Sequence, residues 1–351
     1  MRRARLRCSL RRPRAAAVAA LAPSRARYIA SACAAALLAA LLISASSAPS
    51  PARPSAAPKA GHAGRTAQPA RAGQAGQAGG TATSMALRSA APEGRYVSLG
   101  DSYTAGPLIP VQTGTPAGCL RSNHNYPSLA AAAIHPSSFQ DISCSGAVTG
   151  DMAGSQSVTL GTNPPEFSAL TPATSLVTVQ ISGNDIGFIN IVETCGELSF
   201  TNPAGAPCKA RYTSGGTDQL AAAIQKTAPK VAAVLHGIHQ RSPSAKVLLV
   251  GYPVILPNSG DGCWPAVPIA YGDVPYLRGV ELELNQMLSN EAAANSATYV
   301  NTYTDSIGHD VCRLPGVKWT EGLVPTAPAA PFHPNALGEQ AMARQVLAAL
   351  G

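Results

Sequence analysis

The first 92 of the 351 residues contain no Asp and no Glu, although 14 of them are Lys or Arg. The rest of the chain holds the other 12 Lys and Arg (26 − 14) and all 18 Asp and Glu, so the net charge of +8 divides into +14 and −6. A basic surface on a folded domain is the usual electrostatic mark of a nucleic-acid partner. Because the part after residue 92 is mildly acidic, we expect no nucleic-acid partner.

The N-terminal part also lacks an apolar run of the ~20 residues that a membrane-spanning helix needs. Its apolar run from Tyr28 to Ile43 follows nine Arg and precedes the small residues Ser44 to Ala48, which is the order of a secretory signal. We predict a signal peptide over residues 1–48 and a secreted protein, with an uncleaved signal anchor as the alternative. Residues 49–92 are rich in Ala, Pro and Gly and are predicted to be a disordered linker, which leaves one domain over 93–351.

Metal-binding and nucleotide-binding patterns are missing from that domain. Its six cysteines form no Cys-x-x-Cys pair, so no metal and no cofactor are expected. The sequence has no Gly-x-Ser-x-Gly, Gly-x-Gly-x-x-Gly, P-loop or His-Glu-x-x-His pattern. These are, in that order, the signatures of α/β-hydrolases, dinucleotide-binding domains, nucleotide triphosphatases and zincins, so the sequence does not support any of these classes. An even cysteine number in an exported chain indicates three disulfides with open pairing among Cys119, Cys144, Cys195, Cys208, Cys263 and Cys312.

Short apolar runs alternate with helical patterns through the domain. Such alternation predicts a parallel sheet covered on both faces, that is, a three-layer α/β/α sandwich with five strands. The expected strands are Arg95–Leu99, Phe139–Cys144, Leu176–Ile181, Lys246–Gly251 and Ala297–Val300. The expected helices are Tyr126–Ala133, Asp218–Gln240 (bent or split at Pro229), Val274–Ala294, and a C-terminal helix with Asn335 as its N-cap.

Polar residues follow three of these strands, where a parallel sheet places its ligand-binding edge. Ser102 follows the first strand, and His333 precedes the C-terminal helix, so a His could activate a Ser at this edge. The backbone N–H groups of Ser102 and Gly146 and the side-chain amide of Asn184 are candidate donors to an oxyanion. The three polar segments, called blocks below, follow the first three expected strands and are Gly100-Asp101-Ser102-Tyr103, Ser145-Gly146-Ala147 and Ser182-Gly183-Asn184-Asp185.

Each block alone is ordinary turn chemistry, but their combination resembles the SGNH hydrolases, also called GDSL esterases or lipases. The resemblance spans residues 93–351 and is greatest to the secreted actinobacterial branch with three disulfides, which has a flavodoxin-like sandwich. It implies that Ser102 is the nucleophile, His333 the general base and acid, and Ser102, Gly146 and Asn184 the oxyanion donors. It also implies the pairs Cys119–Cys144, Cys195–Cys208 and Cys263–Cys312.

The chain departs from that family's pattern at two positions. Family members often have Asp three residues before the His, where this chain has Ala330. We therefore expect a Ser-His dyad in which the backbone carbonyl of Ala330 orients His333, with Asp305 and Asp310 as alternative partners. Ser182 stands where the family commonly has Gly, which puts substrate access in question.

These observations predict a secreted serine esterase or lipase that hydrolyses acyl lipids or short-chain esters through an acyl-enzyme. Its partner is the ester or lipid substrate; transient contact with a membrane or lipid surface is compatible with this, and a monomer is expected. The alternatives are a polysaccharide acetyl esterase and a non-catalytic secreted module that binds cell wall or carbohydrate. Asp101 and Asp185 could also be paired acids for glycoside chemistry, although hydrogen bonding within their own turns is the favoured interpretation.

Overall fold

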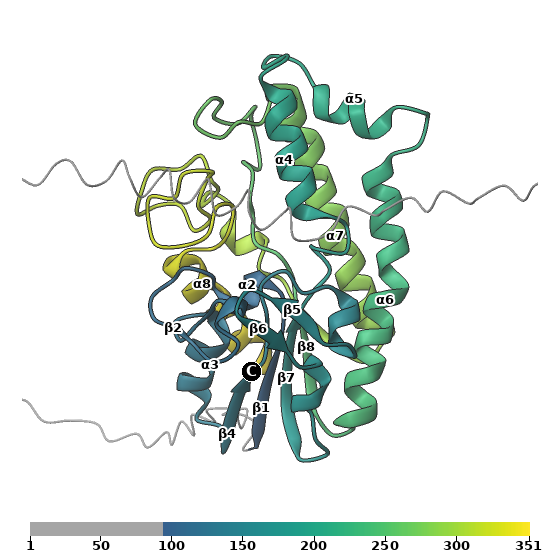
Figure 1. Cartoon of the computed structure of the whole chain (residues 1–351), viewed down its shortest axis with the longest axis vertical. Coiled ribbons are helices and arrows are strands. Elements are labelled where there is room, and N and C mark those ends of the chain that lie inside the picture. The colour runs from purple at the N-terminus through teal and green to yellow at the C-terminus, as the bar shows by residue number, and fades with distance from the viewer. Residues whose placement is uncertain (1–93) are drawn as a thin grey trace, which may run out of the picture. The chain divides into compact units, whose positions relative to one another are not determined.

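A parallel five-stranded sheet with the order β4-β1-β7-β8-β9 forms the centre of the computed structural model, which describes residues 94–351 (Figure 1). The α/β class and the five parallel strands expected from the sequence are confirmed. The predicted signal peptide (1–48) and linker (49–92) lie outside the described residues. In sheet order the strands are Ser138–Asp141 (β4), Arg95–Gly100 (β1), Thr174–Gln180 (β7), Lys246–Val250 (β8) and Thr298–Val300 (β9).

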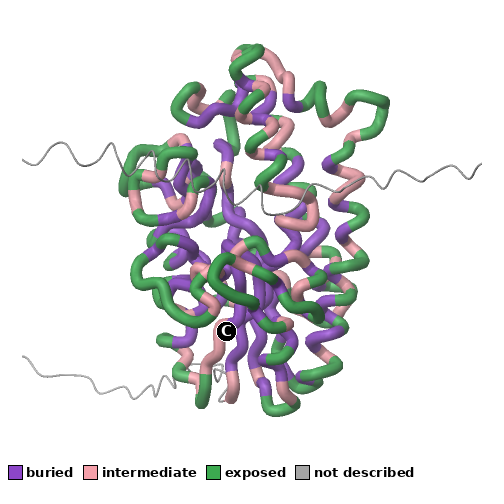
Figure 2. The backbone as a smooth tube through the Cα atoms, in the orientation of Figure 1, coloured by how far each residue is buried: buried purple, intermediate pink, exposed green. Residues whose placement is uncertain are grey.

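Side-chain alternation along the strands divides the core into two layers. Tyr96, Leu176 and Leu248 face one side and pack against α3 (Tyr126–Ile134) and α8 (Ala336–Leu350). Val97, Val177 and Leu249 face the other side, which α6 (Gln219–Arg241) and α7 (Val274–Ala294) cover. The three central strands, β1, β7 and β8, are accordingly the most continuously buried strands of the sheet (Figure 2).

Several shorter elements lie in the connections that follow the carboxyl ends of the strands. The sequence patterns did not predict α2 (Ser102–Ala105), α4 (Phe188–Ser199) or α5 (Pro207–Thr213). The chain also forms two small antiparallel ribbons and the one-turn helix η2, which spans Thr149–Met152. The ribbons pair β2 (Gln112–Thr113) with β3 (Arg121–Ser122), and β5 (Gln156–Val158) with β6 (Gly161–Asn163).

Two helix predictions have different outcomes. Asn335 caps α8 as expected, because its side-chain oxygen accepts hydrogen bonds from the N–H groups of Leu337 (3.0 Å) and Gly338 (3.2 Å). The alternative of a split at Pro229 is wrong, since α6 is one helix with Pro229 inside it. Pro229 and Gln225, whose carbonyl loses its partner, are both exposed. Water can therefore solvate that carbonyl while the apolar face of the helix stays packed.

Three disulfides join Cys119 to Cys144, Cys195 to Cys208 and Cys263 to Cys312, the pairs that the family resemblance implies. The first lies close to the carboxyl edge of the sheet, where the Cys144 N–H donates to the Gly100 carbonyl at 2.8 Å.

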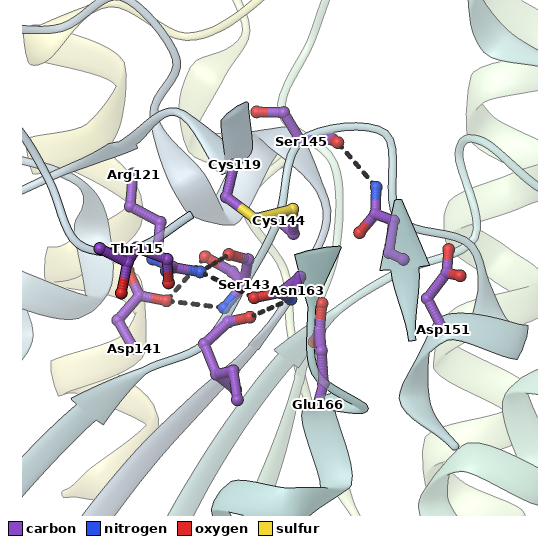
Figure 3. Close-up of a disulfide and its surroundings, with 12 residues drawn as sticks. Thr115, Cys119, Arg121, Asp141, Ser143, Cys144, Ser145, Asp151, Asn163 and Glu166 are labelled. Atoms are coloured by element: carbon purple, nitrogen blue, oxygen red, sulfur yellow. Dashed lines mark hydrogen bonds between the residues drawn. A yellow bond between two sulfur atoms is a disulfide. The ribbon is translucent and has the colours of Figure 1, made fainter. Parts of the chain in front are cut away.

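Polar side chains, several of them buried, lie around that disulfide (Figure 3). Arg121 donates to the Ser143 carbonyl at 2.7 Å, and the Ser143 N–H donates to Asp141 at 3.0 Å. The chain between β4 and η2 is thus anchored by both a covalent bond and hydrogen bonds. Within the part of the chain that the structure describes, no helix is both long enough and apolar enough to span a lipid bilayer.

Two glycines within long helices should respond oppositely to substitution by Ala. Ala in a helix interior is favoured over Gly by about 1 kcal/mol, so Gly279→Ala, with nothing within 4 Å of the added Cβ, should stabilise the protein. A Cβ on buried Gly237 would lie 2.6 Å from the Phe167 ring, so Gly237→Ala should lower the free energy of unfolding by about 1–3 kcal/mol. Urea unfolding of both variants checks this, and equal shifts would contradict the packing of α6 on Phe167.

Candidate active site

Ser102 is presented by a sharp turn between β1 and α2. Gly100 has φ +146°, and a Cβ there would lie 2.5 Å from the Gln180 carbonyl, so a larger residue would strain the turn. The ladder to β7 continues one residue beyond the strand through the Asp101 N–H, which donates to the Gln180 carbonyl at 2.9 Å. The Asp101 side chain then caps α2 by accepting from the Tyr103 N–H at 3.0 Å. Ser102 is consequently the first residue of a helix at the edge of the sheet.

His333 faces this serine from the loop before α8. Its Nε2 lies 2.8 Å from Ser102 Oγ, and its Nδ1 lies 2.7 Å from the Pro331 carbonyl oxygen. A carbonyl can only accept, so Nδ1 carries the hydrogen and Nε2 has the free lone pair that can accept the serine proton. The structure therefore brings the predicted pair Ser102 and His333 together, with the ring in the tautomer that a base requires.

The prediction that the Ala330 carbonyl orients the imidazole is wrong, because the carbonyl of Pro331 does so. The Ala330 carbonyl accepts the backbone N–H of His333 at 3.2 Å and so closes the turn, whereas the ring reaches back to the next carbonyl along the chain. Asp305 instead accepts from Gln345, and Asp310 accepts from Cys312 N–H and Arg313, both at 3.0 Å. In the described part of the chain, His333 Nδ1 thus has a main-chain carbonyl and not a carboxylate as its partner.

Burial lowers the pKa of His333 to about 4, and the hydrogen bond to the Pro331 carbonyl opposes this only in part. The ring is 5% exposed, so its charged form would be poorly solvated. At neutral pH the imidazole is therefore uncharged and available as a proton acceptor.

The predicted oxyanion donors lie on three neighbouring turns. Ser102 and Asn184 border one cavity, while Gly146 lies outside its lining and one residue before Ala147. The Asn184 side-chain amide donates to the Ala147 carbonyl at 2.9 Å and has a second hydrogen to offer. Within residues 94–351, the backbone N–H groups of Ser102 and Gly146 donate to no protein acceptor. Gly146 has φ +82°, which is accessible to glycine without strain.

Tyr252, which the sequence patterns did not indicate, connects the turn of Ser102 with the turn of Asn184. Its hydroxyl donates to Asp101 Oδ2 at 2.5 Å and accepts from the Gly183 N–H at 2.8 Å. Tyr252 comes shortly after β8, so the same rule that directed attention to the other strand ends could have found it. Ser182, on the same turn, has φ +126° and is fully buried, which explains why a glycine is suited to this position.

Both Asp101 and Asp185 accept hydrogen bonds from protein groups. These contacts give each carboxylate a structural role that does not depend on glycoside chemistry. Burial raises the pKa of Asp101 to about 7, while its contacts with Tyr252 and Tyr103 oppose the shift. Its oxygens accept from Tyr103 N–H and Tyr252, and those of Asp185 accept from Thr149 and Lys230. The expectation that each bonds within its own turn holds for one oxygen of Asp101, which accepts from Tyr103 N–H, whereas its other oxygen accepts from Tyr252 and Asp185 bonds to a different loop and to Lys230.

An apolar cavity opens beside Ser102 and extends between α4 and α7. Its walls include side chains from successive turns of both helices, and Phe332 borders it next to His333. Glu281 also borders it, accepts from the Ile255 N–H at 3.1 Å, and has a pKa that burial raises well above the usual value. The apolar lining includes Phe188, Ile191 and Val192 of α4 and Leu277, Val280 and Leu284 of α7. This arrangement can hold an alkyl chain next to a serine-histidine pair.

Among residues 94–351, no group of three or more His, Cys, Asp or Glu side chains is placed to hold a metal ion.

Comparison with known proteins gives a family and several relatives. The model of the GDSL-like lipase/acylhydrolase family matches residues 98–341. Lipase 2 of Streptomyces coelicolor is 39% identical over 268 residues, which cover 75% of this chain and 88% of that protein. Among solved structures, phospholipase A1 from Streptomyces albidoflavus NA297 has a TM-score of 0.62 and 30% identity, covering 74% of this chain and 100% of that one. An extracellular lipase from Streptomyces rimosus has a TM-score of 0.59 and 26% identity, covering 73% and 99%.

The environment of His333 predicts an unusual titration. We expect its ring to become protonated with a midpoint near pH 4, because burial penalises the imidazolium. The measurement is an NMR titration of the histidine rings, with the His333 signal identified by its loss in the His333→Ala spectrum. A midpoint at the ~6.5 of an unperturbed histidine would show that the ring is solvated and that this geometry is wrong.

Proposed function

This chain belongs to the GDSL-like lipase/acylhydrolase family and is an ester-cleaving hydrolase, and we propose that it works through an acyl-enzyme on Ser102. The observation that carries the proposal is the 2.8 Å contact between Ser102 Oγ and the acceptor nitrogen of His333, beside an apolar cavity. A serine becomes a competent nucleophile when a base at this distance takes its proton.

In the proposed reaction, Ser102 Oγ attacks the ester carbonyl while its proton passes to His333 Nε2. The negative charge that develops on the carbonyl oxygen is stabilised by the N–H groups of Ser102 and Gly146 and by the second amide hydrogen of Asn184. His333 then gives the proton to the departing alcohol, and a water activated by the same nitrogen hydrolyses the acyl-enzyme. The Pro331 carbonyl keeps Nδ1–H in place throughout and interacts favourably with the imidazolium that forms transiently.

The cavity supports acyl lipids as the substrates. Transfer of each methylene group from water to an apolar wall is favourable by about 0.8 kcal/mol, and the side chains of α4 and α7 supply such walls beside Ser102. An acetyl group would leave this cavity largely unfilled, which disfavours the polysaccharide acetyl esterase. A module that only binds carbohydrate would have no use for a buried Ser-His contact.

The proposal includes secretion, a monomeric state and transient contact with lipid surfaces. Three disulfides suit an oxidising compartment, and the Streptomyces rimosus relative is described as extracellular. Leu323 (47% exposed) and Val324 (69% exposed) belong to the segment whose Glu321 pairs through its main chain with His333. These side chains support lipid contact close to the loop that carries the base.

Two single substitutions test the assigned roles. With p-nitrophenyl butyrate, Ser102→Ala should abolish turnover, and Asn184→Ala should lower kcat by about 10²- to 10³-fold, the typical cost of one oxyanion donor. Circular dichroism should show both variants folded. Turnover by Ser102→Ala would overturn the acyl-enzyme, and normal kcat in Asn184→Ala would remove that amide from the donor set.

The cavity predicts which residue limits acyl-chain length. Val192 lines it one turn beyond Phe188, which is about 6 Å further along α4. Val192→Trp should fill this part and lower kcat/KM for p-nitrophenyl palmitate by about tenfold or more, since each excluded methylene forfeits about 0.8 kcal/mol. Hydrolysis of the butyrate ester should change little.

Ile189→Trp is the matched control, because Ile189 lies on the same helix but is 47% exposed. Its palmitate-to-butyrate ratio should equal that of the wild type. A Val192→Trp enzyme with an unchanged ratio would mean that the acyl chain lies elsewhere.

A further inference from the structure

Asp185 links two of the turns in the proposed oxyanion site. Its Oδ2 accepts from the Thr149 N–H at 2.8 Å, and its Oδ1 accepts from the Thr149 hydroxyl at 2.6 Å. The carboxylate is 3% exposed, while its other partner, Lys230 at 3.2 Å, is 52% exposed. Hydrogen bonds to a carboxylate are roughly twice as strong as neutral ones, and a two-point contact also fixes orientation. The bond to Thr149 is therefore the buried and directional part of this interaction.

Thr149 begins η2 and follows Gly146 by three residues. Gly146 itself lies within a tight turn, in which the Ala147 N–H donates to the Cys144 carbonyl at 3.0 Å. Asn184 contacts the chain after Gly146 at the Ala147 carbonyl, and Asp185, the next residue, contacts it at Thr149. Two consecutive residues after β7 thus hold the Gly146 loop at two points on the C-terminal side of Gly146.

The N-terminal side of the same loop is attached to other elements. The Ser145 N–H donates to the Cys119 carbonyl at 3.0 Å, and the Gln156 amide donates to the Ser145 carbonyl at 2.9 Å. These contacts fix where the loop begins, but they do not connect it to Asn184. The contacts of Asn184 with Ala147 and of Asp185 with Thr149 are direct hydrogen bonds between the Gly146 loop and the turn that carries the Asn184 amide.

We propose that Asp185 is a positioning residue that keeps the Gly146 N–H in register with the Asn184 amide for transition-state stabilisation. The inference rests on the proposed function, because it concerns the donors assigned there. Displacement of a group by about 1 Å can cost 10²-fold in rate, and donors that act only on the developing charge affect kcat more than substrate binding. Asp185 itself does not touch the substrate in this account.

The test compares variants at both ends of this link with p-nitrophenyl butyrate. Asp185→Ala should lower kcat by about 10- to 100-fold with KM nearly unchanged, a smaller loss than that of a donor itself. Asp185→Asn, which can still accept from the Thr149 N–H, should recover most of kcat. Adding Thr149→Val to Asp185→Ala should produce no further loss, because the hydroxyl that Thr149→Val removes has already lost the Asp185 carboxylate as its acceptor.

Lys230→Met is the matched control, since it removes the exposed ion pair and leaves the Thr149 contact intact. Its kcat should equal that of the wild type. A kcat in Lys230→Met as low as in Asp185→Ala would overturn the proposal, and so would a normal kcat or a change confined to KM in Asp185→Ala. If Asp185→Ala does not fold, Thr149→Val replaces it: this variant removes the hydroxyl half of the two-point contact and keeps the N–H half, so kcat should fall severalfold, and an undiminished kcat overturns the proposal.

Asn184→Ala and Ser102→Ala, measured in parallel, separate this inference from the function on which it rests. A strongly impaired Asn184→Ala beside a fully active Asp185→Ala would overturn only the positioning role. Normal turnover in Asn184→Ala would instead overturn the donor set, and turnover in Ser102→Ala the acyl-enzyme.

Discussion

The hydrogen bond from His333 Nδ1 to the Pro331 carbonyl determines which ring nitrogen faces Ser102. A carbonyl has no formal charge, so it can orient the ring without placing an ionisable partner directly against the imidazole. The consequence is a low pKa, because the desolvation of the imidazolium is opposed by a dipole and not by an anion. The loop from Glu321 to His333 supplies this geometry partly through main-chain pairing, with Glu321 N–H donating to the His333 carbonyl at 2.9 Å, and partly through side chains, since the Asn335 amide donates to the Glu321 carboxylate at 2.7 Å.

Each turn around this pair is held by a side chain that comes from a different strand end. Tyr252, after β8, connects Asp101 with Gly183, and Tyr103, after β1, donates to the Phe332 carbonyl at 2.6 Å. These hydroxyls and carboxyls are buried, so each unmade hydrogen bond would cost about 1–3 kcal/mol. A network of this kind favours one arrangement of the loops over the many that a purely apolar interface would tolerate.

The sequence was informative where local patterns decide the structure. Strand positions, the capping of α8 by Asn335 and the meeting of Ser102, Asn184 and His333 at one sheet edge follow from periodicity, turn chemistry and the edge rule. It was less informative where distant groups decide. Tyr252 acquires its role only through Asp101, which is 151 positions away. The choice between the carbonyls of Ala330 and Pro331 depends on how one turn closes, and residue types do not encode that choice.

The low pKa of His333 also bears on what the reaction does to its own surroundings. Each ester cleaved near neutral pH releases a carboxylic acid with a pKa of ~4–5, which gives up a proton. Where buffering is weak, an enzyme whose base had the ordinary ~6.5 would slow as its product accumulated. In the proposed mechanism, a His333 ring that stays unprotonated down to about pH 4 would keep accepting the serine proton while the acid product lowers the surrounding pH.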